Sequence, residues 1–248
     1  MFIYYYIYKY MIVDKVIAEL NKSSDPEKAK NLSRFFKTGK GQYGEGDIFI
    51  GVMLPAQRTI VKKYYKEITL TEIKKLLSNP IHEYRLTALI MLVMKAKRAN
   101  EKNKKEYFEF YLQNTHFINN WDLVDVTCRD ILGEYLLDKD RAILYKLAIS
   151  KDLWKKRIAI ISTFAFIRRR DLSDSLRIAE ILVNDRHDLI HKAVGWTLRE
   201  VGKIDQKLEE DFLKKHFKTM PRTTLRYAIE KFPKKLRDFY LGRLPHQE

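Results

Sequence analysis

The chain has 248 residues, of which 46% are hydrophobic, so it contains enough apolar material for a continuous core and is not disordered. Lys and Arg total 48 against 32 Asp and Glu, which gives a formal net charge of +16. This excess goes beyond what solubility requires and favours a polyanionic partner, although a solvated basic surface without a partner is the alternative.

Cys128 is the only cysteine, which excludes an intrachain disulfide and a cysteine cage for zinc. Its place in an apolar helical pattern predicts a small buried core residue rather than a nucleophile. The sequence contains no run of 18 apolar residues, so no transmembrane helix is expected. We therefore predict a cytoplasmic protein that does not bind a membrane.

The amino-terminal part begins with residues 1–10, which hold five tyrosines and lack the features of a signal peptide. They are either an extension of the first helix or the product of a misplaced start codon. Helices are predicted near 13–22, 26–37 and 55–67 from apolar residues spaced three and four apart.

A glycine-rich loop is predicted over residues 38–50, because residues 38–46 contain four glycines. Its backbone amides could bind a phosphate group. However, no GxxxxGK pattern followed by Ser or Thr is present, so the loop is predicted to be a connector.

The remainder, residues 71–232, is predicted to be a tandem array of helix pairs, within one α-helical repeat domain that spans 1–248. Five segments align in register, with steps of 36, 36, 35 and 34 residues, and their first residues are Arg85, Trp121, Arg157, Lys192 and Arg226. Companion helices are predicted between them, at 101–114, 139–149, 172–182 and 206–218. Such units bury their apolar faces only by stacking on one another.

Asp125 breaks the repeat, because its register position holds an aliphatic or aromatic residue in three of the other four units: Leu89, Ile161 and Trp196, with Glu230 in the last. At about 100° per residue, Trp121 lies within the apolar arc of its helix and Asp125 lies at the margin of that arc. Asp122 is predicted to face water at the helix start, and Asp130 also points away from the arc. Asp125 is therefore the carboxylate most suited to a functional role, while core packing is the alternative interpretation for Trp121 and Trp196.

Several segments of the chain resemble the AlkD-like DNA alkylation-repair family in matching order and spacing, from about residue 14 to 232. They read NWDLVD at 120–125, LWKKRIAI at 153–160, HKAVGWTLRE at 191–200 and FIGVMLPAQR at 49–58. The sequence departs from the family at Asn120, where some members carry a second aromatic residue, and in the longer loop at 38–46.

The resemblance implies a right-handed superhelix of HEAT-like repeats with a concave basic channel, and the excision of 3- and 7-alkylated purines from double-stranded DNA. It implies that Asp125 is the catalytic carboxylate, that Trp121 and Trp196 are the aromatic walls of the lesion site, and that Arg157 contacts the DNA backbone. No lysine stands beside Asp125 in the register, so we expect a monofunctional glycosylase for base excision repair, acting as a monomer without a cofactor.

Other cations are predicted to contact phosphates from successive repeats: Arg85, Lys156, Lys192 and Arg199. The alternative is that such cations bridge neighbouring repeats. His187 and His191 lie one turn apart, but no third ligand stands out, so no metal site is predicted. The competing functional hypothesis is a non-catalytic repeat scaffold that binds nucleic acid or an acidic protein, and a weaker one is an RNA-binding repeat protein.

Overall fold

A computed structural model of the chain describes residues 11–243. Within this range the regular elements are helices, accompanied by one isolated parallel bridge between Ile48 and Ile81. The all-α prediction is therefore confirmed. The internal contacts divide the chain into two compact units, Met1–Thr127 and Cys128–Glu248, which we call unit 1 and unit 2. The single repeat domain stays a prediction, and residues 1–10 lie outside the described range.

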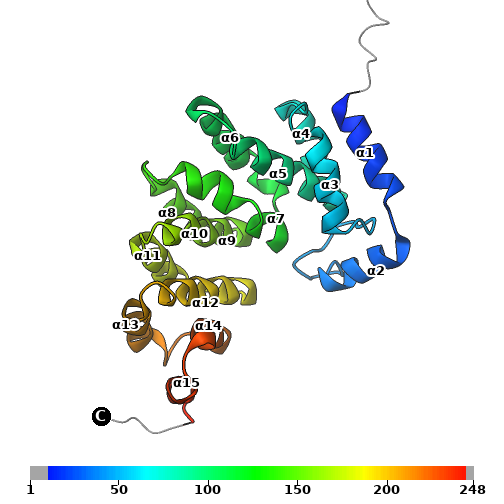
Figure 1. The fold of residues 1–248 in the computed structure, drawn as a ribbon. Coiled ribbons are helices and arrows are strands. Elements are labelled where there is room, and N and C mark those ends of the chain that lie inside the picture. Colours follow the sequence, from blue (N-terminus) through cyan, green and yellow to red (C-terminus); the bar gives the residue numbers. More distant parts are fainter. Residues whose placement is uncertain (1–10, 244–248) are drawn as a thin grey trace, which may run out of the picture. The chain divides into compact units, whose positions relative to one another are not determined.

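Unit 1 contains two rows of helices that pack on each other (Figure 1). Its first row consists of α1 (Ile12–Lys22), α4 (Leu70–Leu77) and α6 (Glu101–Gln113), and its second row of α3 (Leu54–Tyr64), α5 (His82–Ala96) and α7 (Trp121–Asp125). Helix α2 (Pro26–Phe35) leads from α1 into the glycine-rich loop, and a short 3₁₀ helix (Thr115–Phe117) precedes α7. The three helices predicted for the amino-terminal part are thus present.

Local signals explain where several of these helices begin. The Asp25 carboxylate accepts the N–H groups of Glu27 and Lys28, with Pro26 in the first turn of α2. Thr69 and Glu72 form a capping box at the start of α4. The Glu72 carboxylate also accepts the N–H of Val13 at 3.2 Å, so this cap ties α4 to α1.

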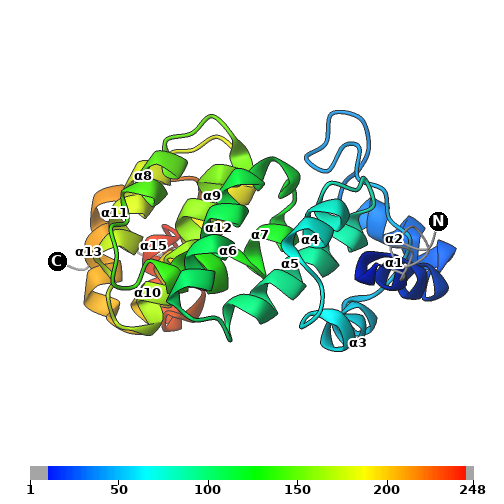
Figure 2. The same cartoon turned by 90° about the horizontal axis from the view of Figure 1, so that it is seen from above.

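Unit 2 repeats the two-row arrangement. Its first row consists of α8 (Ala142–Ala148), α11 (Ser173–Leu182) and α13 (Gln206–His216), and its second row of α9 (Leu153–Ser162), α12 (Asp188–Gly202) and α14 (Arg222–Ala228). Figure 2 shows α8, α11 and α13 following one another along one edge of the unit. The remaining elements are a π-helical turn (Arg129–Gly133), α10 (Phe164–Arg168), a 3₁₀ turn (Ile229–Lys231) and α15 (Lys234–Tyr240). Cys128 is fully buried, as predicted.

The repeat register agrees with the structure, because the aligned segments lie on α5, α7, α9 and α12, and the last begins on α14 and ends in the 3₁₀ turn that follows it; these helices are all members of the second rows. The residues taken as helix openings are nevertheless one turn too late in four cases. Arg85 is the fourth residue of α5, and Arg157, Lys192 and Arg226 are each the fifth of their helix. The helices start earlier because caps such as Asp152 and His187 precede them.

Close packing in unit 2 depends on Gly195 in α12. A Cβ atom there would lie 2.4 Å from the carbonyl oxygen of Thr224 in α14. The missing side chain therefore lets α12 and α14 approach each other. Throughout residues 11–243, the helices fall short of the combined length and apolar character needed to cross a bilayer.

Candidate active site

Trp121 and Asp125 are the first and last residues of α7. Because they are four residues apart, their side chains lie on the same face of the helix. Both are half-buried, whereas Leu123 and Val124 between them are fully buried. This burial agrees with the prediction that Asp125 lies at the margin of the buried face.

The start of α7 is fixed by Asn120, which has no exposed surface. Its side-chain oxygen accepts the N–H of Trp121 at 2.8 Å, and its amide nitrogen donates to Asp47 at 2.9 Å. An aromatic residue at this position would provide neither hydrogen bond. Asn120 therefore links the start of α7 to Asp47 in the glycine-rich loop.

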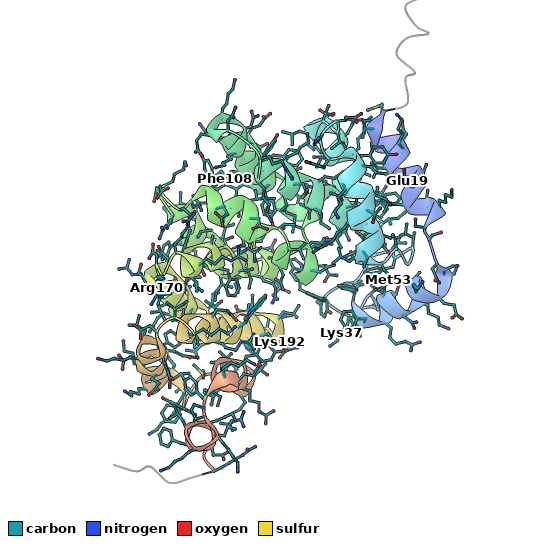
Figure 3. The ribbon with its side chains drawn as sticks, viewed as in Figure 1. Glu19, Lys37, Met53, Phe108, Arg170 and Lys192 are labelled. Carbon is teal, nitrogen blue, oxygen red and sulfur yellow. The ribbon has the colours of Figure 1, made fainter. Side chains whose placement is uncertain are left out.

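Aromatic rings from distant segments stack against Trp121. The ring of Phe36 lies between those of Trp121 and Phe49, with centroids 5.2 Å and 5.0 Å away and nearly parallel planes. Phe35 meets the edge of Trp121 at 6.0 Å, and 64% of its surface is exposed. Lys37 follows these residues and is exposed as well (Figure 3). Trp121 thus belongs to an aromatic surface supplied mainly by the end of α2.

The glycine-rich loop folds back on α2, which makes it more than a connector. The N–H of Gly44 donates to the carbonyl of Lys37, and a Cβ on Gly44 would lie 2.4 Å from the carbonyl oxygen of Phe36. Only a residue without a side chain permits this approach. The loop then delivers Asp47, which is 7% exposed, to a buried position beside α5 and α7.

Asp47 belongs to a buried polar network centred on His82. The Nδ1 atom of His82 lies 2.9 Å from Asp47, and its Nε2 atom lies 2.8 Å from Asp122. Arg85 donates to the second oxygen of Asp47 and to Asn119, both at 2.5 Å. The rings of Phe49 and Phe36 cover the imidazole, with centroids 4.5 Å and 5.1 Å away. The loop, α5 and α7 therefore meet at this histidine.

The network shifts the pKa values of its members. Burial alone would lower the pKa of His82, but the hydrogen bonds to Asp122 and Asp47 outweigh it and raise that pKa to about 9. Burial would also raise the pKa of Asp47, yet the hydrogen bond from His82 and the charge of Arg85 leave it below its usual value. At neutral pH the pair is therefore an imidazolium and a carboxylate.

The structure corrects the predictions for Asp122 and Asp130. Asp122 does not face water: it is 8% exposed, because the start of α5, which carries His82, covers this side of α7. Asp130 is also 8% exposed and pairs with Arg129. Arg85 is 5% exposed and bonded to Asp47, and its contact with a phosphate stays a prediction.

In unit 2, Trp196 is half-buried on α12. Its ring packs against Phe164, with centroids 4.7 Å apart, and its Nε1–H donates to Glu200 one turn further along the helix at 3.2 Å. Trp196 is therefore held by its own helix and by a neighbouring one.

The other predicted cations of unit 2 have partners within the unit. Arg157 is 5% exposed and donates to the carbonyl of Leu189 at 2.5 Å, which links α9 to α12. The remaining contacts are Lys156 with Asp185 at 2.6 Å, Lys192 with Asp188 at 2.7 Å, and Arg199 with Glu230. Lys192 extends from α12 (Figure 3) and keeps 39% of its side chain exposed.

The histidine pair of the sequence plays a local role. The side chain of His187 accepts the N–H of Leu189 at the start of α12, and His191 contacts the carbonyl of Asp185 at 2.6 Å. Over residues 11–243, no three or more His, Cys, Asp or Glu side chains gather as a metal ion would require.

Comparison with known proteins identifies the class of this helical-repeat chain. The family model described as DNA alkylation repair enzyme matches residues 16–232. The chain therefore belongs to the family of DNA alkylation repair enzymes. No curated protein matches it. A solved structure, a predicted DNA alkylation repair enzyme from Enterococcus faecalis, is similar in fold, with a TM-score of 0.68 and 18% identity over 86% of this chain and 98% of that one.

Proposed function

We propose that this chain is a monofunctional DNA glycosylase that hydrolyses the N-glycosidic bond of cationic 3- or 7-alkylated purines in duplex DNA. One observation carries the proposal: Asp125 is half-buried, one turn from half-buried Trp121, in a family of DNA alkylation repair enzymes. The neighbouring carboxylates of Asp47 and Asp122 are buried against His82 and are less accessible than Asp125.

The reaction needs no general acid at the base, because an N7- or N3-alkylated purine carries a positive charge and leaves as a neutral base. As the glycosidic bond breaks, its electron pair goes to the base and positive charge develops on the deoxyribose. The Asp125 carboxylate would stabilise that charge at C1′. It would also orient the water whose oxygen bonds to C1′ and accept the proton that this water loses.

Aromatic and basic side chains would hold the DNA. Trp121 and the exposed ring of Phe35 present a π-surface that attracts a cationic lesion, and Trp196 is proposed to supply a second wall. Phosphate groups would replace the acidic partners of the partly exposed cations Lys156, Lys192 and Arg199. Arg157 is proposed to contact the DNA backbone from α9. The net charge of +16 favours such binding.

The test is incubation of the protein with methylated duplex DNA, followed by chromatography of the released bases. The wild-type chain is expected to release 7-methylguanine and 3-methyladenine, and Asp125→Asn to release little of either while it retains DNA affinity. Asp138→Asn removes an exposed carboxylate elsewhere and serves as the control. Equal release by wild type and Asp125→Asn would exclude Asp125 from the mechanism, and no release by wild type would refute the glycosylase.

A further inference from the structure

The buried histidine of unit 1 has a geometry that core packing alone does not require. Both ring nitrogens of His82 lie within 2.9 Å of carboxylate oxygens, one from Asp47 and one from Asp122. An ionised carboxylate is only an acceptor of hydrogen bonds, so both nitrogens must donate. The ring between the two carboxylates is therefore an imidazolium.

We propose that the His82 imidazolium, clamped between Asp47 and Asp122, is a positioning device that sets the orientation of α7 and thereby of Trp121 and Asp125 at the reacting sugar. This inference rests on the proposed glycosylase function. His82 is not a catalytic residue, because it lies beneath α7 with 1% of its surface exposed.

The clamp acts on the start of α7 through two connections. Asp122, the second residue of α7, accepts a hydrogen bond from His82 and one from the N–H of Leu123. Asp47 accepts from His82 and from Asn120, and Asn120 in turn binds the N–H of Trp121. Loss of a proton on His82 would remove the imidazole donor from one of these buried carboxylates, so the start of α7 would be held less firmly.

Charged groups from several elements surround the His82 ring and affect whether it is protonated. The loop supplies Asp47 and α7 supplies Asp122, while α5 itself supplies Arg85 on Asp47 and Glu83, which binds the N–H groups of residues 50–52. The C-cap residue of α2, Phe36, contributes an aromatic ring. Two cations thus face Asp47 and Asp122, and Glu83 is occupied by the backbone. Deprotonation of His82 would leave this buried cluster with an excess negative charge.

The first test is a pH titration followed by NMR of the imidazole nitrogens and of the three indole N–H groups. We expect His82 to carry two ring protons at neutral pH and to lose one near its raised pKa of about 9. The indole signal of Trp121 should shift with the same midpoint, whereas those of Trp154 and Trp196 should not. The proposal would be overturned by a neutral His82 ring at pH 7, or by a Trp121 indole signal that does not shift as His82 titrates.

The second test measures single-turnover base release by His82→Gln and by the control Thr87→Val. Thr87 lies on the same helix and bonds to Gln57, away from the clamp, so the control reports general destabilisation of α5. His82→Gln is expected to release base about 10- to 100-fold more slowly at neutral pH. Its DNA affinity should stay within about 2-fold of wild type, since the DNA-binding cations are unchanged.

Dividing the wild-type rate by the His82→Gln rate at each pH cancels the effect of pH on the substrate. This ratio should fall towards one above the pKa of His82. If His82→Gln does not fold, the experiment is done with Asp122→Asn, which keeps the shape of the site. Equal rates for the variant and the wild type at neutral pH would overturn the positioning role. Absence of base release by the wild type would refute the proposed function instead, and the NMR titration would then decide the clamp on its own.

Discussion

The two tryptophans proposed to line the lesion site are supported differently in their two units. Trp121 depends on segments that are distant in sequence, namely Phe36 from α2 and the loop residue Asp47 acting through Asn120. Trp196 depends on Phe164 of a neighbouring helix and on Glu200 of its own helix. Trp196 is therefore placed by contacts among the repeat helices of unit 2. In unit 1 the glycine-rich loop and its buried ionic network also contribute to the position of Trp121.

The largest expected difference comes from removing one paired carboxylate from each unit. Asp47→Asn leaves the charge of Arg85 buried without its anion and removes one of the two carboxylates that face His82, which should cost about 3–5 kcal/mol in the free energy of unfolding. Asp185→Asn in unit 2 removes the partner of Lys156, whose side chain is 24% exposed, and should cost about 1 kcal/mol. Urea denaturation measures both, and equal losses would show that the loop network is no more critical than an ordinary ion pair.

A pH dependence of stability should also come from the buried histidine of unit 1. Because folding raises the pKa of His82 from 6.5 to about 9, its stabilising contribution is complete below pH 6.5 and is lost as the pH rises through about 9. At about 1.4 kcal/mol per pKa unit, the full effect is roughly 3 kcal/mol.

The measurement is the free energy of unfolding between about pH 6 and about pH 10, for wild type and His82→Gln. The decline should be smaller in the variant, since Gln carries no titrating proton. A decline of the same size in both proteins would assign it to other groups.

Unit 2 should instead be sensitive to helix packing. Gly195→Ala places a Cβ atom 2.4 Å from the Thr224 carbonyl oxygen, so α12 and α14 must separate, at a cost of about 1–3 kcal/mol. Gly39→Ala in the loop meets only the flexible side chain of Gln42, at 3.1 Å, and should be nearly neutral. Thermal unfolding of the two variants tests this contrast. It is wrong if Gly39→Ala is the more damaging substitution.

The smallest effect on stability is expected for Phe35, whose ring is 64% exposed. Phe35→Ala should change the free energy of unfolding by less than about 0.5 kcal/mol. Base release should nonetheless slow several-fold, because the aromatic surface beside Trp121 is lost. Ile149→Ala removes another exposed apolar side chain, 72% exposed in unit 2, and should change neither quantity. Unchanged base release by Phe35→Ala would remove this ring from the proposed site.

The repeat period was sufficient to predict the helix pairs and the second-row positions of the site residues, since stacked units keep the same spacing of apolar residues. It was not sufficient for the surroundings of α7. A helical wheel treats α7 as a helix with one buried face, but α7 is five residues long and is also covered by the loop. The helical wheel therefore predicts wrongly that Asp122 faces water.

Three other features escaped sequence reasoning because their partners are far apart in the chain. His82 contacts carboxylates 35 and 40 residues away, and no local pattern marks such a pair. Phe35 and Phe36 end an otherwise polar helix, and this unusual pair before the glycines was the available signal. The four glycines indicated a loop, but not that Gly44 would bring Asp47 to α7.

The most direct test of the central claim is the single-turnover rate on a duplex that carries one 7-methylguanine, with protein in excess, for wild type and Asp125→Asn. At equal DNA occupancy we expect Asp125→Asn to be about 100-fold slower or more, since an amide cannot neutralise the charge on the sugar. Rates that agree within experimental error would contradict the assignment of Asp125 as the carboxylate that acts on the lesion.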